Sequence, residues 1–187
     1  LEVYDRHQLL TDRSVLAHGI WLDDGDRRRL AETGAQIAFC PSSNLFLGSG
    51  LFDWSRARAA GVAVSLACDV GGGTSLSMLR TMADAYKVQA LAGQRLTAWA
   101  LLHAATRGAA QALRIAHEIG ALDAGMIADF CVWDWACGPV AQRRDALARG
   151  LHERVFAWLT LGDERCLHSA WVRGRCRWQR SNEEMGA

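Results

Sequence analysis

The chain has 187 residues, of which 50% are hydrophobic, and its formal net charge at pH 7 is +1. This apolar content is sufficient for a sizeable core, and the balanced charge gives no electrostatic reason to expect nucleic acid or an anionic membrane as partner. No apolar run approaches the roughly 20 residues that span a bilayer, and no signal peptide opens the sequence. We therefore expect neither nucleic-acid nor membrane partners and a cytoplasmic location by default.

The six cysteines include no C-x-x-C pair, and several lie within apolar runs. A cysteine in such a run behaves as a small hydrophobic residue. The pattern therefore favours reduced, mostly buried thiols over disulfides or a zinc knuckle. The cysteines are Cys40, Cys68, Cys131, Cys137, Cys166 and Cys176.

The first predicted element is a helix over residues 1–10 that lacks an N-cap, as though the sequence starts within a helix of a longer protein. Residues 14–20 then form a short apolar strand that ends at His18 and Gly19. A histidine at the end of a strand is more often a structural residue than a catalytic one. Both interpretations of His18 stay open at this point.

Two further helix and strand units follow. Residues 23–33 form a charged amphipathic helix with aspartates in its first turn, and Gly34 ends it. Residues 36–40 form a second strand, which stops at Pro41 because proline has no N–H for a sheet ladder. The Pro, Ser, Asn and Gly content of residues 41–50 predicts a loop, and residues 52–60 form the next helix.

The most distinctive stretch is residues 62–75, an apolar strand that runs into Asp69 and then into three consecutive glycines. Glycines in a row continue neither a strand nor a helix, so Asp69 stands at the carboxyl end of the strand. Residues 75–86 have helical spacing. Asp69 is a candidate metal ligand or general base, and it is equally a candidate loop cap.

Strands and helices thus alternate over residues 15–90, which predicts parallel strands with right-handed crossovers. His18, the segment 42–44 and Asp69 then share the carboxyl rim of the sheet, where parallel α/β proteins bind ligands. The glycines also suggest a phosphate-binding loop, but they do not give G-x-G-x-x-G, and no Gly-Lys-Ser/Thr follows.

The rest of the sequence is mainly scaffold. Thr97 caps a helix that runs to about Arg107 with His103 as a packed or surface residue, residues 129–134 form a strand, and residues 151–161 form an amphipathic helix. Arginines alternate with other residues over 172–178, which predicts a strand with a solvated face and leaves a nucleic-acid patch as a weaker alternative. Residues 181–187 are expected to be disordered.

Three segments of this sequence carry a family resemblance: Ala17-His18-Gly19-Ile20, then CPSSNLFLGSG at residues 40–50, then DVGGGTSLSML at residues 69–79. In this order they resemble signatures of the guanine deaminases of the amidohydrolase superfamily, and segments at 120–125, 128–130 and 161–165 extend the resemblance over nearly the whole chain. It implies an α/β fold, the C-terminal part of a (β/α)8 TIM-type barrel with strands six to eight. Residues 1–118 would be the barrel part, and residues 119–187 the remaining helices and strands returning to a small flanking β domain.

The resemblance also implies a zinc site. In the family, two histidines of an H-x-H motif and a third histidine join the strand-eight aspartate around Zn2+. Asp69 matches that aspartate, and His18 matches the strand-six histidine that contacts the water at the metal without binding zinc. The six histidines of this chain form no H-x-H, so the other ligands, the proton-shuttling glutamate and the residues that read the purine edge are expected in a missing N-terminal part.

The sequence departs from the family pattern at two positions near the expected site. Cys68 stands where the family commonly has Thr, and Trp21 stands where a second histidine often follows His18. Neither change replaces a ligand. Cys68 raises the question of thiol sensitivity, and Trp21 affects how the loop packs over a purine.

We therefore expect zinc-dependent hydrolysis of guanine to xanthine and ammonia by a complete protein that is a homodimer. Zinc would lower the pKa of a bound water toward about 7, Asp69 would take the proton of that water and His18 would orient it. Catalytic zinc needs about three protein ligands, so the 187-residue chain alone is expected to bind zinc weakly and to be inactive. The alternatives are an aminohydrolase or halohydrolase for another aminated heterocycle, and an inactive truncated product.

Overall fold

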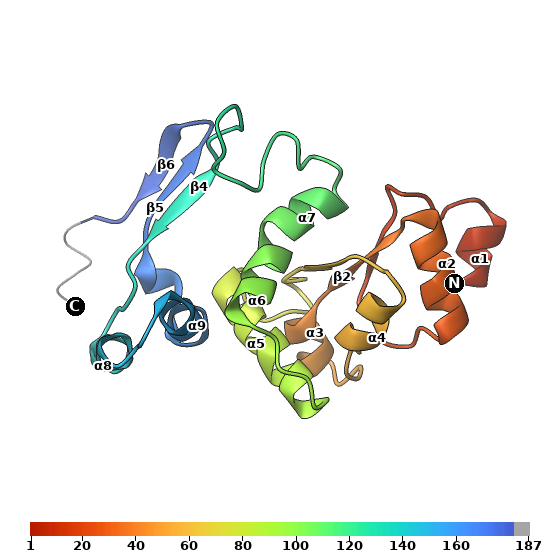
Figure 1. Ribbon diagram of the computed structural model, residues 1–187, viewed down its shortest axis with the longest axis horizontal. Helices are drawn as coiled ribbons and strands as arrows, with labels where there is room; N and C mark the ends of the chain where they lie inside the picture. Colours follow the sequence, from red (N-terminus) through yellow and green to blue (C-terminus); the bar gives the residue numbers. More distant parts are fainter. Residues whose placement is uncertain (182–187) are drawn as a thin grey trace.

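A computed structural model describes residues 1–181 and contains two three-stranded sheets (Figure 1). The strands are β1 (Val15–Ala17), β2 (Gln36–Phe39), β3 (Val64–Leu66), β4 (Phe130–Trp133), β5 (Leu167–Val172) and β6 (Arg175–Gln179). The first three pair in parallel in the order β1-β2-β3. The last three pair antiparallel in the order β4-β5-β6.

Helices connect these strands. Those before β3 are α1 (Glu2–Arg6), α2 (Asp24–Thr33), α3 (Pro41–Phe46) and α4 (Trp54–Ala59). Those after β3 are α5 (Met78–Leu91), α6 (Ala98–Ala105), α7 (Arg107–Ala112), α8 (Pro139–Ala146), α9 (Leu151–Leu161) and the 3-10 helix η1 (Glu164–Cys166). Figure 1 shows α1 toward one end of the long axis and the antiparallel sheet toward the other, with α5 and α6 between them.

The parallel sheet aligns the ends of its strands. Ala17 of β1 is the register partner of Ala38 in β2, and Phe39 of β2 is the partner of Leu66 in β3. All three strands therefore finish at one edge, and the chain leaves each of them on the same side. This confirms the predicted succession of parallel strands and helices over residues 15–90.

The ends of two helices follow from their sequence as predicted. The Asp23 side chain accepts a hydrogen bond from the Asp26 N–H while the Asp26 side chain accepts one from the Asp23 N–H, which is a capping box at the start of α2. Gly34 ends α2 with a φ of 74°, a conformation that glycine adopts without strain. Thr97 caps α6 by accepting from the Ala100 N–H at 3.1 Å.

Two local predictions are wrong. Residues 41–50 are not loop throughout, because α3 occupies the first six of them with Pro41 in its first turn, where the fixed φ of proline suits a helix and its missing N–H needs no partner. Residues 172–178 are not one strand either. Arg173 and Gly174 have φ of 52° and 70° and form the two-residue turn between β5 and β6, which is the backbone that tight hairpins require.

The cysteines are free thiols, as predicted, but most of them are not buried. Cys40 and Cys166 are buried, Cys131 and Cys176 are exposed, and the other two are partly buried. Both exposed cysteines lie in the antiparallel sheet, where one face of a strand can remain open to water. Among the described residues, no helix is long and apolar enough to cross a membrane. The prediction for residues 181–187 falls, beyond Ser181, outside the described part of the chain.

One hydrophobic core joins the parallel sheet to helices from late in the sequence. Ile37 of β2, Leu101 of α6 and Leu159 of α9 are fully buried members of it. Helix α9 packs against α5 and α6, and the rings of Tyr86 and Phe156 meet edge to face with centroids 4.9 Å apart. The elements around the rim are therefore supported by residues more than 80 positions further along the chain.

The position of α9 in this shared core predicts how substitutions on that helix change stability. Leu159→Ala should lower the free energy of unfolding by about 2–5 kcal/mol, because it leaves a cavity beneath α5 and α6. Leu151→Ala is the matched control on the same helix, where the side chain is 56% exposed, and it should change stability by about 0.5 kcal/mol or less. Urea unfolding of both variants measures the difference. Equal effects would mean that α9 is not part of this core.

Candidate active site

Two polar side chains stand just beyond the carboxyl ends of β1 and β3. His18 directly follows β1, and its N–H continues the ladder by donating to the Ala38 carbonyl at 2.9 Å. Asp69 follows β3 after two residues. Both have positive φ, 68° for His18 and 49° for Asp69, in the left-handed region that few residues other than Gly, Asn, Asp and His adopt. The strained backbone turns both side chains out of the strand pattern at the rim.

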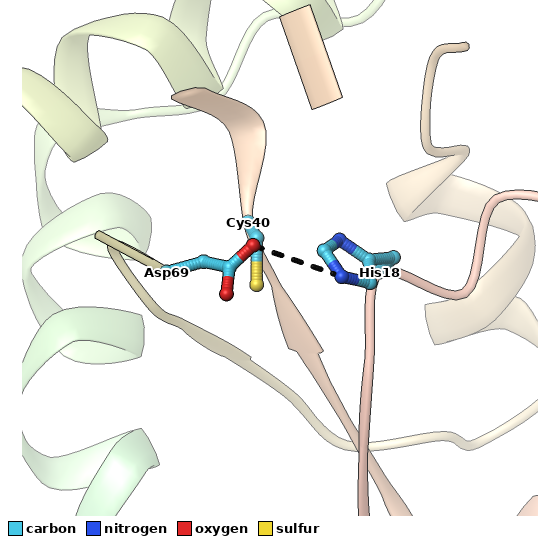
Figure 2. Close-up of side chains that lie close together, drawn as sticks. All are labelled: His18, Cys40 and Asp69. Atoms are coloured by element: carbon cyan, nitrogen blue, oxygen red, sulfur yellow. Dashed lines mark ion pairs between the residues drawn. The ribbon is translucent and has the colours of Figure 1, made fainter. Parts of the chain in front are cut away.

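His18 and Asp69 face each other across the rim (Figure 2). The distance from Nε2 of His18 to Oδ2 of Asp69 is 3.8 Å, which is too long for a direct hydrogen bond. An oxygen atom about 2.8 Å from both atoms fits to one side of the line between them. Both side chains are about 40% exposed, so water and small molecules reach this position.

Cys40 is a third member of this cluster that the sequence did not reveal. Figure 2 shows its sulfur beside the Asp69 carboxylate, at the end of β2. Burial raises the pKa of the Cys40 thiol to about 11, with the charge of Asp69 acting in the same direction and the backbone N–H of His18 opposing it. The thiol is therefore protonated at neutral pH and does not act as a proton acceptor in this cluster. The one signal in the sequence was the place of Cys40 at the end of the middle strand.

The segment 42–44, also predicted at the rim, lies on α3 and supports His18. Oδ1 of Asn44 is 2.8 Å from Nδ1 of His18. Ser42 instead turns toward α5, where its hydroxyl donates to Asp84 at 2.8 Å. Of the predicted rim residues, Asn44 therefore joins His18 and Asp69, and Ser42 fastens α3 to the scaffold.

The glycine loop folds back on Asp69. The Gly73 N–H donates to the backbone carbonyl of Asp69, and among the described residues no hydrogen bond from the loop reaches the Asp69 carboxylate, which leaves that carboxylate free to face His18. The loop-cap alternative therefore has no hydrogen bond to support it. Helix α5 begins only at Met78, so the glycines do not form the helix terminus that a phosphate-binding loop requires.

Other residues considered from the sequence lie away from this cluster or at its margin. His103 lines a cavity of about 640 Å³ between α4, α6 and α7, next to Val62 and Val64 near the start of β3. Trp21 is 85% exposed on the loop after His18. Cys68 is partly buried and directly precedes Asp69. None of these side chains belongs to the cluster of His18, Cys40 and Asp69.

The cluster has the chemistry of a metal site. His18, Cys40 and Asp69 each offer one ligand atom, and these atoms all lie within 4.8 Å of one another. Imidazole nitrogen, thiolate sulfur and carboxylate oxygen are the donor atoms that zinc uses in proteins. The residues present therefore fit a metal ion, with the carboxylate of Asp69 as the ligand that the sequence predicted.

Comparison with known proteins agrees with this arrangement. Residues 1–176 match the model of the amidohydrolase family. The chain belongs to the amidohydrolase family. It is 39% identical to guanine deaminase from Escherichia coli over 181 residues, which is 97% of this chain and 41% of that protein. The chain thus spans about two fifths of the length of this relative.

Solved structures agree in fold. The E. coli guanine deaminase superposes with a TM-score of 0.94 at 39% identity, over 96% of this chain and 42% of that one. Guanine deaminase from Bradyrhizobium japonicum gives a TM-score of 0.87 at 33% identity, over 96% of this chain and 45% of that one. An adenosine deaminase from Xanthomonas campestris with bound zinc gives a TM-score of 0.79 at 25% identity, over 95% of this chain and 40% of that one. The α/β architecture is therefore that of amidohydrolases, and a relative with bound zinc points to a metal cofactor.

The tight glycine loop after Asp69 predicts that a side chain at Gly73 destabilises the protein. A Cβ at Gly73 would lie 2.0 Å from the carbonyl oxygen of Cys68, so Gly73→Ser must open the loop and should lower the free energy of unfolding by about 1–3 kcal/mol. Gly150→Ser is the matched control, because its Cβ meets nothing within 4 Å and serine is a good N-cap for α9. Urea titrations compare the two, and an unchanged Gly73→Ser variant would contradict the tight loop.

Proposed function

We propose that this chain is the C-terminal part of a zinc-dependent guanine deaminase. Strands β1, β2 and β3 act as strands six, seven and eight of a (β/α)8 barrel, residues 1–118 form the barrel part, and residues 119–187 return to a small flanking β domain. The complete protein is a homodimer that converts guanine and water to xanthine and ammonia. Residues outside this sequence supply the remaining metal ligands.

The observation that carries this proposal is the meeting of His18 and Asp69 at one rim. Their reactive atoms are 3.8 Å apart in a chain that belongs to the amidohydrolase family and is 39% identical to a guanine deaminase. Their positive φ adds support, because strained backbone at two facing polar residues is typical of functional sites. The structural alternative for His18 explains neither its 41% exposed side chain nor its approach to a carboxylate.

Asp69 has two tasks in the proposed reaction. One carboxylate oxygen would hold zinc, which when present makes a water molecule acidic enough to react near neutral pH. The other oxygen accepts the proton of the attacking water. The water oxygen forms a bond to the purine carbon that bears the amino group. One of the two water protons passes from Asp69 to the amino nitrogen, and the other passes to the adjacent ring nitrogen. The bond from the carbon to the amino nitrogen then breaks, and its electron pair leaves with ammonia.

His18 works on the same water from the other side. Its Nε2 is 3.8 Å from Oδ2 of Asp69, so a water oxygen placed beside both atoms would hydrogen-bond to both, and the ring would orient that water before attack. The same hydrogen bond stabilises the water as it attacks the purine carbon. Asp69 therefore holds the metal and accepts a proton, whereas His18 only orients and stabilises.

These different roles predict different losses in the complete protein. Asp69→Asn removes both the charged ligand and the proton acceptor, so zinc content and guanine turnover should both fall. His18→Asn leaves the metal ligand in place, so zinc content should stay near normal while kcat falls about 10²-fold or more. Metal analysis and xanthine formation, measured on the same protein samples, test both variants.

Thr97→Ala provides the control, because it weakens the cap of α6 by about 1 kcal/mol far from the rim residues in sequence and should leave zinc and kcat unchanged. Full kcat in His18→Asn, or zinc loss as complete as in Asp69→Asn, would contradict the role of His18. Turnover of adenine or an s-triazine in place of guanine by the wild-type protein would contradict the substrate.

A further inference from the structure

Asn44 contacts the ring nitrogen of His18 that does not face Asp69. Its Oδ1 lies 2.8 Å from Nδ1, while Nε2 of the same ring faces Oδ2 of Asp69 at 3.8 Å. We propose that Asn44 is a positioning residue that holds the proton of His18 on Nδ1 and keeps Nε2 directed at the reacting water. Its effect on turnover rests on the proposed function, whereas its effect on the ring does not.

The chemistry of the two groups fixes where the proton lies. An amide oxygen only accepts hydrogen bonds, so Nδ1 of His18 must be the donor in this contact. The neutral ring then has a lone pair on Nε2, with which it accepts a hydrogen bond from water. Free histidine in water favours the opposite tautomer, with the proton on Nε2. Asn44 therefore selects the form of the ring in which Nε2 can accept from the attacking water.

Asn44 is held rigidly enough for this task. It is 2% exposed on α3, its N–H donates to the Cys40 carbonyl at 3.1 Å, and its own carbonyl accepts from the Ser49 N–H at 2.9 Å. The bond from Ser42 to Asp84 ties the same helix to α5. Because the backbone N–H and C=O of Asn44 are both hydrogen-bonded, its side chain positions His18 more precisely than a side chain on a free loop would.

A purely structural role explains Asn44 poorly. Its Nδ2 is buried without a hydrogen-bond partner among the described residues, and a buried amide N–H without a partner is unfavourable. A leucine of similar size would avoid that cost. Gln89 on α5 is the contrasting case, because it is fully buried and both of its amide atoms are paired, with Trp54 and with Phe52. What Asn44 contributes is the acceptor for His18.

The test uses the complete, zinc-loaded protein with 15N-labelled histidine. Long-range proton–nitrogen spectra report the tautomer of His18, whose signals are assigned by their loss in His18→Gln. Wild-type protein should show the proton on Nδ1. Asn44→Leu should move it to Nε2 and lower kcat about 10- to 100-fold with little change in KM or zinc content. Asn44→Asp keeps an acceptor at the same position and should retain the Nδ1 proton and recover most of kcat.

Gln89→Met is the control for simple loss of a buried amide, and it should lower the melting temperature without changing the tautomer of His18 or kcat. If Asn44→Leu does not fold, Asn44→Ser replaces it, since its shorter side chain leaves Nδ1 without the amide acceptor. The inference is wrong if the wild-type ring carries its proton on Nε2. It is equally wrong if Asn44→Leu keeps the tautomer and kcat, or if Gln89→Met lowers kcat as much.

These results separate the inference from the proposed function. Wild-type protein that turns over guanine while Asn44 has no influence on His18 would overturn only the role of Asn44. Wild-type protein that does not turn over guanine, but in which Asn44 fixes the tautomer, would overturn only the proposed function.

Discussion

Backbone hydrogen bonds between β1, β2 and β3 are the interaction on which the rest of this structure depends. Each strand is only three or four residues long, so the parallel register alone decides where each chain segment leaves the sheet. That register brings His18, Cys40 and Asp69 together although they are separated by 22 and 29 positions in the sequence. A shift by one residue would turn each side chain to the opposite face and separate the cluster.

The rim of the parallel sheet contains several features that destabilise the folded state. Positive φ at His18 and Asp69 is unfavourable for the folded state, and so is the amide N–H of Asn44, which has no partner among residues 1–181. The core beneath compensates, with Phe39 and Leu66 buried at the ends of β2 and β3. The costly features are concentrated at the residues with candidate chemical roles, and the core below them is apolar and well packed.

The larger features of the fold could be predicted from the sequence, but the local geometry of the rim could not. Alternating apolar strands and amphipathic helices predicted the parallel sheet, and the strand ends predicted His18, the 42–44 segment and Asp69 at one rim. Composition alone could not separate a loop from the short helix α3, because Pro, Ser and Asn favour helix N-termini as well as turns. The sequence also could not reveal Cys40, whose role depends on the distance to side chains from two other strands.

The position of α9 in the core has a consequence for synthesis on the ribosome. The sheet and rim are complete by residue 73, yet Val155 and Leu159 fill the core against α5 and α6 only after residues 151–161 have emerged. Until then the apolar faces of α5 and α6 lack their covering helix. The nascent chain therefore exposes them while about 55 to 70 further residues are translated, which takes several seconds at ordinary elongation rates. A chaperone would act in this interval.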